Sequence, residues 1–282
     1  MIKKNCIQKN NYYIKDMALT REEKKKKILE KIKNFRLMDD DFMTKFFEND
    51  LESTSIVLQI IMENPKLKVL EAVSQSGIKN LQGRSVRLDV KATDETGKIY
   101  DIEIQRADKG AGAERARYNS ALIDANLLLS GEKTEKLPET YVIFITENDV
   151  IGVGEPVYHI DRTIAETGKL FGDGAHIIYV NGEFRGNTPV GDLMHDFNCS
   201  NPADMKLKVL ADRARYFKEN EKGVNQMCRA VEELILDERM EEKEEIVIEM
   251  LKENFEIEKI AKIVKLPVES VKKIAEKVTV KA

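Results

Sequence analysis

The chain has 282 residues, of which 42% are hydrophobic and 34% are charged, with a net charge of −4. This length and composition are typical of a globular protein with one sizeable core and a smaller appendage. The net charge excludes a uniformly basic nucleic-acid-binding protein. Any polyanion must therefore be bound by a local basic patch or through metal ions. The longest apolar runs are too short for a membrane span, no signal peptide is recognisable, and the three cysteines show neither zinc nor disulfide spacing, so we expect a cytoplasmic protein with no membrane partner.

Residues 1–33 are a polar, lysine-rich leader that contains the run Lys24–Lys27. Such a segment is typical of a solvated or frayed leader, and a basic arm that touches phosphates is the alternative. Apolar residues then recur at helical spacing from Phe42 to Ile61, and Asn64-Pro65 ends that helix. We expect the main domain to cover residues 34–225.

The middle of the chain alternates between strand and helix patterns. We expect a strand over residues 67–73, a hairpin over residues 85–106, a helix over residues 114–130 that is capped by Gly131, and buried strands over residues 141–146 and 176–180.

The chain is highly charged and helical in pattern from about Asn201, and we expect residues 226–282 to form a charged helical tail that is broken at Pro267. The segment Ile257–Ile274 resembles a small helix-turn-helix. Its lysines favour contact with DNA, whereas the glutamates between them favour packing or a homodimer, and both alternatives stay open.

The hairpin places acidic residues on two neighbouring strands. If residues 95–97 form a three-residue loop with Gly97 in the left-handed position, Asp94 pairs with Lys98. The same register pairs Lys91 with Asp101 and Asp89 with Glu103, because directly opposed residues point to the same face. Leu88, Val90, Tyr100, Ile102 and Ile104 then form the opposite, apolar face.

The opposed pair Asp89 and Glu103 has no base between its carboxylates. Like charges in this position destabilise a hairpin, and a divalent cation between them removes the conflict. Mg²⁺ binds carboxylate oxygens and waters, often through one or two carboxylates. The sequence therefore predicts a metal clamp, and an amphipathic hairpin whose polar face meets solvent is the alternative.

Five segments follow one another along the chain: GRSVRLD (residues 83–89), YDIEIQR (100–106), RARYNS (115–120), YVIFITE (141–147) and HIIYVNG (176–182). The series, from about Asp40 to Asn220, resembles the PD-(D/E)XK nuclease superfamily. More narrowly, it resembles the PD-(D/E)XK nuclease family transposases, or Rpn-type recombination-promoting nucleases. The resemblance implies a restriction-endonuclease-like α/β fold, in which a mixed sheet is flanked by helices, with a helical C-terminal tail.

The resemblance also implies metal-dependent hydrolysis of phosphodiester bonds in DNA, with Mg²⁺ or Mn²⁺ as cofactor. Asp89 and Glu103 become metal ligands, together with the carbonyl of Ile104. Gln105 stands where the superfamily has a lysine, so it can orient a water but brings no positive charge. Glu52, with Glu48 behind it, is the candidate for the superfamily's helical acid.

The nearest residues for contact with DNA are Arg106, Arg115, Arg117 and Tyr118. Arg115 and Arg117 lie two apart on the expected helix and cannot share a face, so we expect at most one of them to meet phosphate. The expected function is a DNA endonuclease linked to a mobile element or to recombination. The alternative is a catalytically silent nucleic-acid-binding or interaction protein on the same fold.

Overall fold

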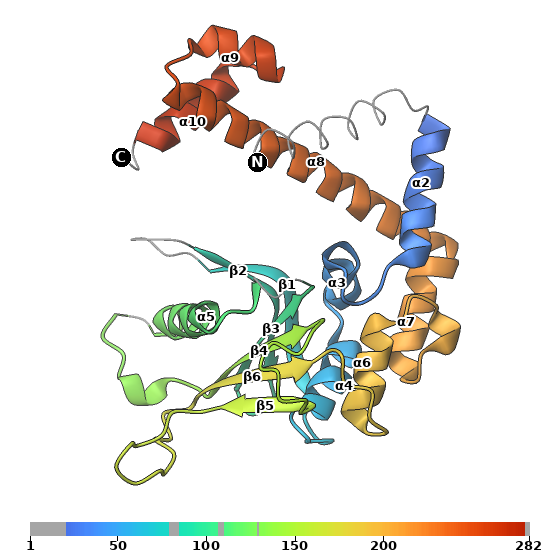
Figure 1. Cartoon of the computed structure of the whole chain (residues 1–282), viewed down its shortest axis with the longest axis vertical. Coiled ribbons are helices and arrows are strands. Elements are labelled where there is room, and N and C mark those ends of the chain that lie inside the picture. The colour runs from blue at the N-terminus through green and yellow to red at the C-terminus, as the bar shows by residue number, and fades with distance from the viewer. Residues whose placement is uncertain (1–20, 79–84, 107–109, 129, 280–282) are drawn as a thin grey trace. The chain divides into compact units, whose positions relative to one another are not determined.

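A six-stranded mixed sheet forms the centre of the first of two units, which divide between Cys228 and Arg229 (Figure 1). This computed structural model describes residues 21–78, 85–106, 110–128 and 130–279. The strand order is β1-β2-β3-β4-β6-β5. The strands are β1 (Val69–Ile78), β2 (Val86–Asp94), β3 (Ile99–Gln105), β4 (Thr140–Thr146), β5 (Val157–Ile160) and β6 (Ala175–Asn181).

The helices of the described residues precede, interrupt and follow the sheet. They are α2 (Arg21–Asn34), α3 (Asp40–Phe47), α4 (Leu51–Ile61), α5 (Ala113–Ala125), α6 (Pro189–Asn198), α7 (Lys208–Glu219), α8 (Glu221–Lys252), α9 (Ile257–Val264) and α10 (Val268–Thr279), with short 3-10 turns η2 (Thr134–Lys136) and η3 (Pro202–Asp204). None of the described helices combines the length and the apolar character that crossing a membrane needs.

Helices cover both faces of the sheet in the first unit (Figure 1). On one side α3 and α4 pack against β1, and α6 and α7 pack behind α4. On the other side α5 packs against β4 and β6. The strands β3 and β4 are therefore buried along almost their whole length, as expected for parallel neighbours in the middle of a mixed sheet. The expected fold class is confirmed.

The register of the hairpin is confirmed where β2 and β3 pair. Gly97 has φ 83, and the Asp94 N–H donates to the carbonyl of Lys98 at 3.1 Å. Lys91 pairs directly with Asp101. The loop chemistry of three residues thus set the alignment of the two strands, as the sequence predicted.

Several element boundaries differ from the prediction. The helical pattern of residues 42–61 is two helices, because Asn49 has φ 53 and turns the chain between α3 and α4. Helix α5 ends at Ala125, before the expected end at residue 130. The short edge strand β5 was not predicted, and β1 extends to Ile78.

The expected leader and the expected tail are helical where the structure describes them. Residues 1–20 and 280–282 lie outside the described residues, whereas the end of the expected leader forms α2, in which Ile32 is buried. The expected tail boundary at residue 226 falls within α8. In the second unit α9 and α10 form a small core with the end of α8, and Lys265, with φ 54, separates the two short helices before Pro267.

We predict that Gly97→Ala lowers the free energy of unfolding by about 1 kcal/mol, because an alanine is strained at φ 83. Gly77→Ala on β1 is the matched control. A Cβ atom meets nothing within 4 Å at either position, and only Gly97 has a left-handed φ. Urea unfolding of the three proteins measures the difference. Equal stabilities for the two variants would contradict the strain argument.

Candidate active site

Two acidic side chains of β3 are buried beneath α5. Asp101 and Glu103 have 0% exposure. The Nδ2 of Asn119 donates to Asp101 Oδ2 at 3.2 Å, and the guanidinium of Arg115 forms an ion pair with Glu103. The alternative of a polar hairpin face in solvent is therefore wrong for β3, because α5 covers it.

The buried face of α5 is more polar than the sequence predicted. Ala121 and Ala125 are exposed, whereas Asn119 and Ser120 are buried. Asn119 lies over the buried carboxyl of Asp101. A buried carboxyl needs a hydrogen-bond donor above it, so an amide side chain takes the place of an apolar one.

Asp89 lies where β2 separates from β3. The pairing of these strands ends at Val90 and Ile102, and beyond it the N–H of Ile104 donates to Asp89 Oδ2 at 2.9 Å. The carboxylate thus serves as an acceptor for the backbone of β3. The neighbouring β1 is also irregular at this level, because Gln75 has φ 54.

Leu88 was expected on the face opposite the acids, and this is wrong. It belongs to the hydrophobic cluster that contains Ala116 and Ile123 of α5. The pairing of β1 with β2 passes from Ser74–Val90 to Ser76–Leu88 across the left-handed Gln75. Both strands advance by two residues there, so no extra residue is inserted, and the left-handed φ of Gln75 is the irregularity at this level of the sheet.

The carboxyl groups of the site have raised pKa values, mainly because they are buried. The pKa of Asp89 is raised to about 7, chiefly by burial and then by the nearby charges of Glu103 and Asp40, whereas the N–H of Ile104 opposes the rise. Burial, and then Glu103, raise the pKa of Asp101 well above its ordinary value. Burial also raises the pKa of Glu103, although Arg115 opposes this. The fully ionised cluster is therefore unfavourable without an added cation.

Asp40 is the acid that sequence reasoning missed. It is the first residue of α3, and its charge acts on Asp89. Burial and the neighbouring Asp41 raise the pKa of Asp40, whereas Arg106 and Arg115 lower it. Its only signal in the sequence was the acidic run before Phe42, which is also what an ordinary helix start shows.

Glu52, the expected helical acid, lies elsewhere. It is exposed in the first turn of α4 and lines a cavity of about 400 Å³ with residues of α7, including Asp212 and Arg213. Among the described residues no contact joins it to Asp89 or Glu103. Glu48, at the end of α3, pairs with Lys45. The structure therefore does not bring these glutamates to the acids of the hairpin.

Arg115 links the residues around the buried acids. Its guanidinium pairs with Glu103 and donates to Gln105 Oε1 at 3.1 Å and to the carbonyl of Gly110 at 3.0 Å. A Cβ at Gly110 would lie 1.9 Å from Gln105 Oε1, so glycine at this position leaves room for the amide of Gln105. The guanidinium of Arg115 thus contacts both Gln105 and Glu103.

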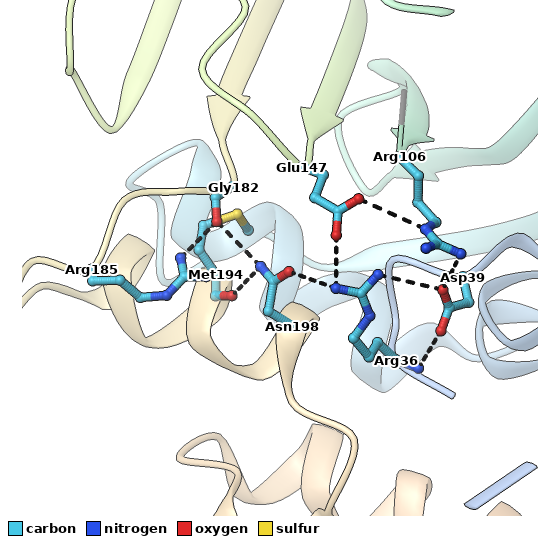
Figure 2. Close-up of polar contacts among 8 residues, drawn as sticks. All are labelled: Arg36, Asp39, Arg106, Glu147, Gly182, Arg185, Met194 and Asn198. Atoms are coloured by element: carbon cyan, nitrogen blue, oxygen red, sulfur yellow. Dashed lines mark hydrogen bonds and ion pairs between the residues drawn. The ribbon is translucent and has the colours of Figure 1, made fainter. Parts of the chain in front are cut away.

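A second polar network joins α3 to the carboxyl ends of the parallel strands, as Figure 2 shows. Arg36 donates to Glu147 at 2.7 Å and to Asn198 at 3.4 Å, and its backbone N–H donates to Asp39 at 2.7 Å. Arg106 pairs with the same Asp39 at 2.9 Å and with Glu147 at 3.7 Å. Asp40 directly follows Asp39, so this network holds the start of α3 beside the sheet.

The residues expected to contact DNA lie in two places. Arg106 is half exposed and is paired with acids in the network of Figure 2. Arg117 and Tyr118 line a cavity of about 900 Å³ beside α5, together with Arg87 and Arg115.

The donor set suits a hard divalent cation. Among the described residues no three His, Cys, Asp or Glu side chains converge into a ready metal cluster. Asp89 and Glu103 nevertheless offer two carboxylates, which is the number that Mg²⁺ often uses beside waters. The buried Oε1 of Glu103 and Oδ1 of Asp101 have no hydrogen-bond partner in the described part of the chain. Such orphaned oxygens fit a site completed by a cation or a proton.

A family model described as "PD-(D/E)XK nuclease family transposase" matches residues 39–186, which is more than half of the chain. The match includes Asp40, the hairpin and α5. No curated protein and no solved structure shows significant similarity to the chain.

We predict that Asp89→Asn stabilises the metal-free protein, and more so at higher pH. The pKa of Asp89 is about 7 when folded and ordinary when unfolded, so the wild type loses stability as the pH rises from about 4 to 7. The gain from Asp89→Asn should be about 2 kcal/mol larger at pH 8 than at pH 5.

Urea unfolding in EDTA at both pH values measures this gain. Glu95→Gln, a change at an exposed acid in the hairpin turn, is the control and should show no such pH dependence. An equal effect of Asp89→Asn on stability at both pH values would contradict a raised pKa of Asp89 in the folded protein.

Proposed function

The chain belongs to the PD-(D/E)XK nuclease family transposases, and on this basis we propose that it is a metal-dependent deoxyribonuclease that hydrolyses phosphodiester bonds. The observation that carries the proposal is the proximity of the carboxyl groups of Asp89 and Glu103, whose pKa values are both raised, with the charge of Asp40 acting on Asp89. A link to a mobile element or to recombination rests on the family name alone.

Asp89, Glu103 and the carbonyl of Ile104 are the groups we assign to hold Mg²⁺ or Mn²⁺. When bound, this cation supplies Lewis-acid activation of a water nucleophile and neutralises charge that develops on the phosphate. Asp40 adds a third acidic group at the start of α3, and its carboxylate can accept hydrogen bonds from water. Asn119 keeps Asp101 in place beneath α5.

Gln105 and Arg115 together supply what a lysine at position 105 would supply alone. The amide of Gln105 orients a water by hydrogen bonding. Arg115 brings the positive charge, because its Nη1 lies 3.1 Å from Gln105 Oε1. If a bound cation were to balance the charge of Glu103, this arginine would be available to stabilise the phosphate. The missing lysine is therefore no argument against hydrolysis.

The second candidate is a catalytically silent DNA-binding protein on the same fold. It is favoured by one observation, the ion pair between Arg115 and Glu103, in which a side chain already provides the counter-charge that a metal would provide. A silent protein binds DNA without a need for Asp89 or Glu103.

We predict that the wild type nicks supercoiled plasmid in Mg²⁺ or Mn²⁺ and that EDTA stops the reaction. Asp89→Ala and Glu103→Ala should each lower the rate roughly 100-fold or more, because each removes a carboxylate ligand. Glu71→Ala, at an exposed acid on β1, is the matched control and should keep full activity. An intact plasmid with wild-type protein that still binds DNA would support the silent alternative.

We predict that Asp40→Asn lowers the nicking rate at least about tenfold, whereas Glu52→Gln leaves it within about twofold. Both changes remove one negative charge from the first turn of a helix, α3 or α4. Only Asp40 acts on Asp89. The same plasmid assay measures both variants. A loss of nicking with Glu52→Gln alone would mean that Glu52 of α4, and not Asp40, is the helical acid of the site.

A further inference from the structure

Two cavities lie beside the acidic cluster and differ in charge. The cavity beside α3, of about 670 Å³, is lined by Lys31, Arg36 and Arg106 and by Asp39, Asp40 and Asp41, so its formal charges cancel. Each of its bases is engaged in an ion pair with an acid. Among the described residues that line this cavity, no cation is free to bind a phosphate.

The cavity beside α5 is basic. Its described lining includes Arg87, Arg115, Arg117 and the acid Glu114. Because Arg115 is paired with Glu103, Arg87 and Arg117 leave one positive charge in excess over Glu114. Arg87 on β2 and Arg117 on α5 are exposed. In the described part of the chain neither has a hydrogen bond or an ion pair.

This basic cavity adjoins the buried acids. Arg115 lines it and pairs with Glu103, and Asn119 lines it and bonds Asp101. A phosphate held by the two unpaired arginines therefore lies on the α5 side of the proposed reaction site. The N-terminal end of α5 also lines the cavity, and its helix dipole favours an anion there.

The size and lining of the cavity favour one strand over a duplex. Its volume of about 900 Å³ is in the range of small-ligand pockets. Tyr118 lines it, and an aromatic side chain stacks on a base only where that base is not already stacked in a duplex. Positive charge beside an aromatic side chain is the pattern that proteins use for single strands.

We propose that Arg87, Arg117 and Tyr118 form a binding subsite for a single DNA strand, with the two arginines on phosphates and the tyrosine on an unpaired base. The proposal rests on the deoxyribonuclease function, because it names the form of DNA that reaches the acids. It separates these residues from Arg106, whose guanidinium is held by Asp39 and Glu147.

The test measures the affinity for a fluorescent 15-nucleotide single strand by anisotropy in EDTA, over a range of salt concentrations. Arg87→Gln and Arg117→Gln should each weaken binding about three- to tenfold and reduce the salt slope by about 0.7. Tyr118→Leu should weaken binding about tenfold without a change in slope. Arg215→Gln, at an exposed arginine paired with Asp212 on α7, should bind as the wild type does.

The outcomes decide the proposal in either direction. Unchanged affinity and slope in the two arginine variants, or no binding by the wild type, would overturn it. A duplex of the same sequence that binds as tightly as the single strand would overturn the preference for one strand. Thermal melting of each variant shows that the fold is intact.

Because binding is measured in EDTA, the result is independent of cleavage. Wild-type binding with the expected losses, but no nicking in Mg²⁺, would refute the nuclease and keep the subsite. If the wild type nicks plasmid but the two arginine variants bind the single strand normally, the nuclease is supported and the subsite is refuted.

Discussion

The burial of two carboxyl groups on the central strand β3 is the constraint on which the rest of the first unit depends. Asp101 and Glu103 are two residues apart, about 6.6 Å along a strand, and the residues above them, Asn119 and Arg115, are four apart, about 6 Å along a helix. The spacings match, so each acid meets one donor of α5. The polar face of this helix is therefore determined by the acids beneath it.

The hairpin was predictable because its information is local. Gly97 fixed the loop, the loop fixed the register, and the pairing of Lys91 with Asp101 followed. The burial of the acidic face was not predictable, because it depends on a helix that follows the hairpin in sequence and covers it only in three dimensions. Leu88 was misplaced for a related reason, since its cluster with Ala116 and Ile123 of α5 forms only in three dimensions.

Asp40 and Glu52 show why the position of an acid relative to the hairpin is hard to predict from sequence. Both start a helix and both precede apolar residues, so their patterns are equivalent. The left-handed Asn49 separates the two helices, and the network around Arg36 directs only the first acid toward the sheet. Contacts between segments that are distant in sequence determine which of the two acids lies near the hairpin, and such contacts cannot be inferred from a single sequence.

The network of Figure 2 also has a consequence for the order in which the protein is made. Arg36 is held by Asn198, which is synthesised 162 residues later, and the neighbouring Met38 N–H donates to the carbonyl of Phe197. A ribosome releases the hairpin long before it releases α6. The segment that precedes α3 therefore gains its contacts with Asn198 and Phe197 only after α6 has been made.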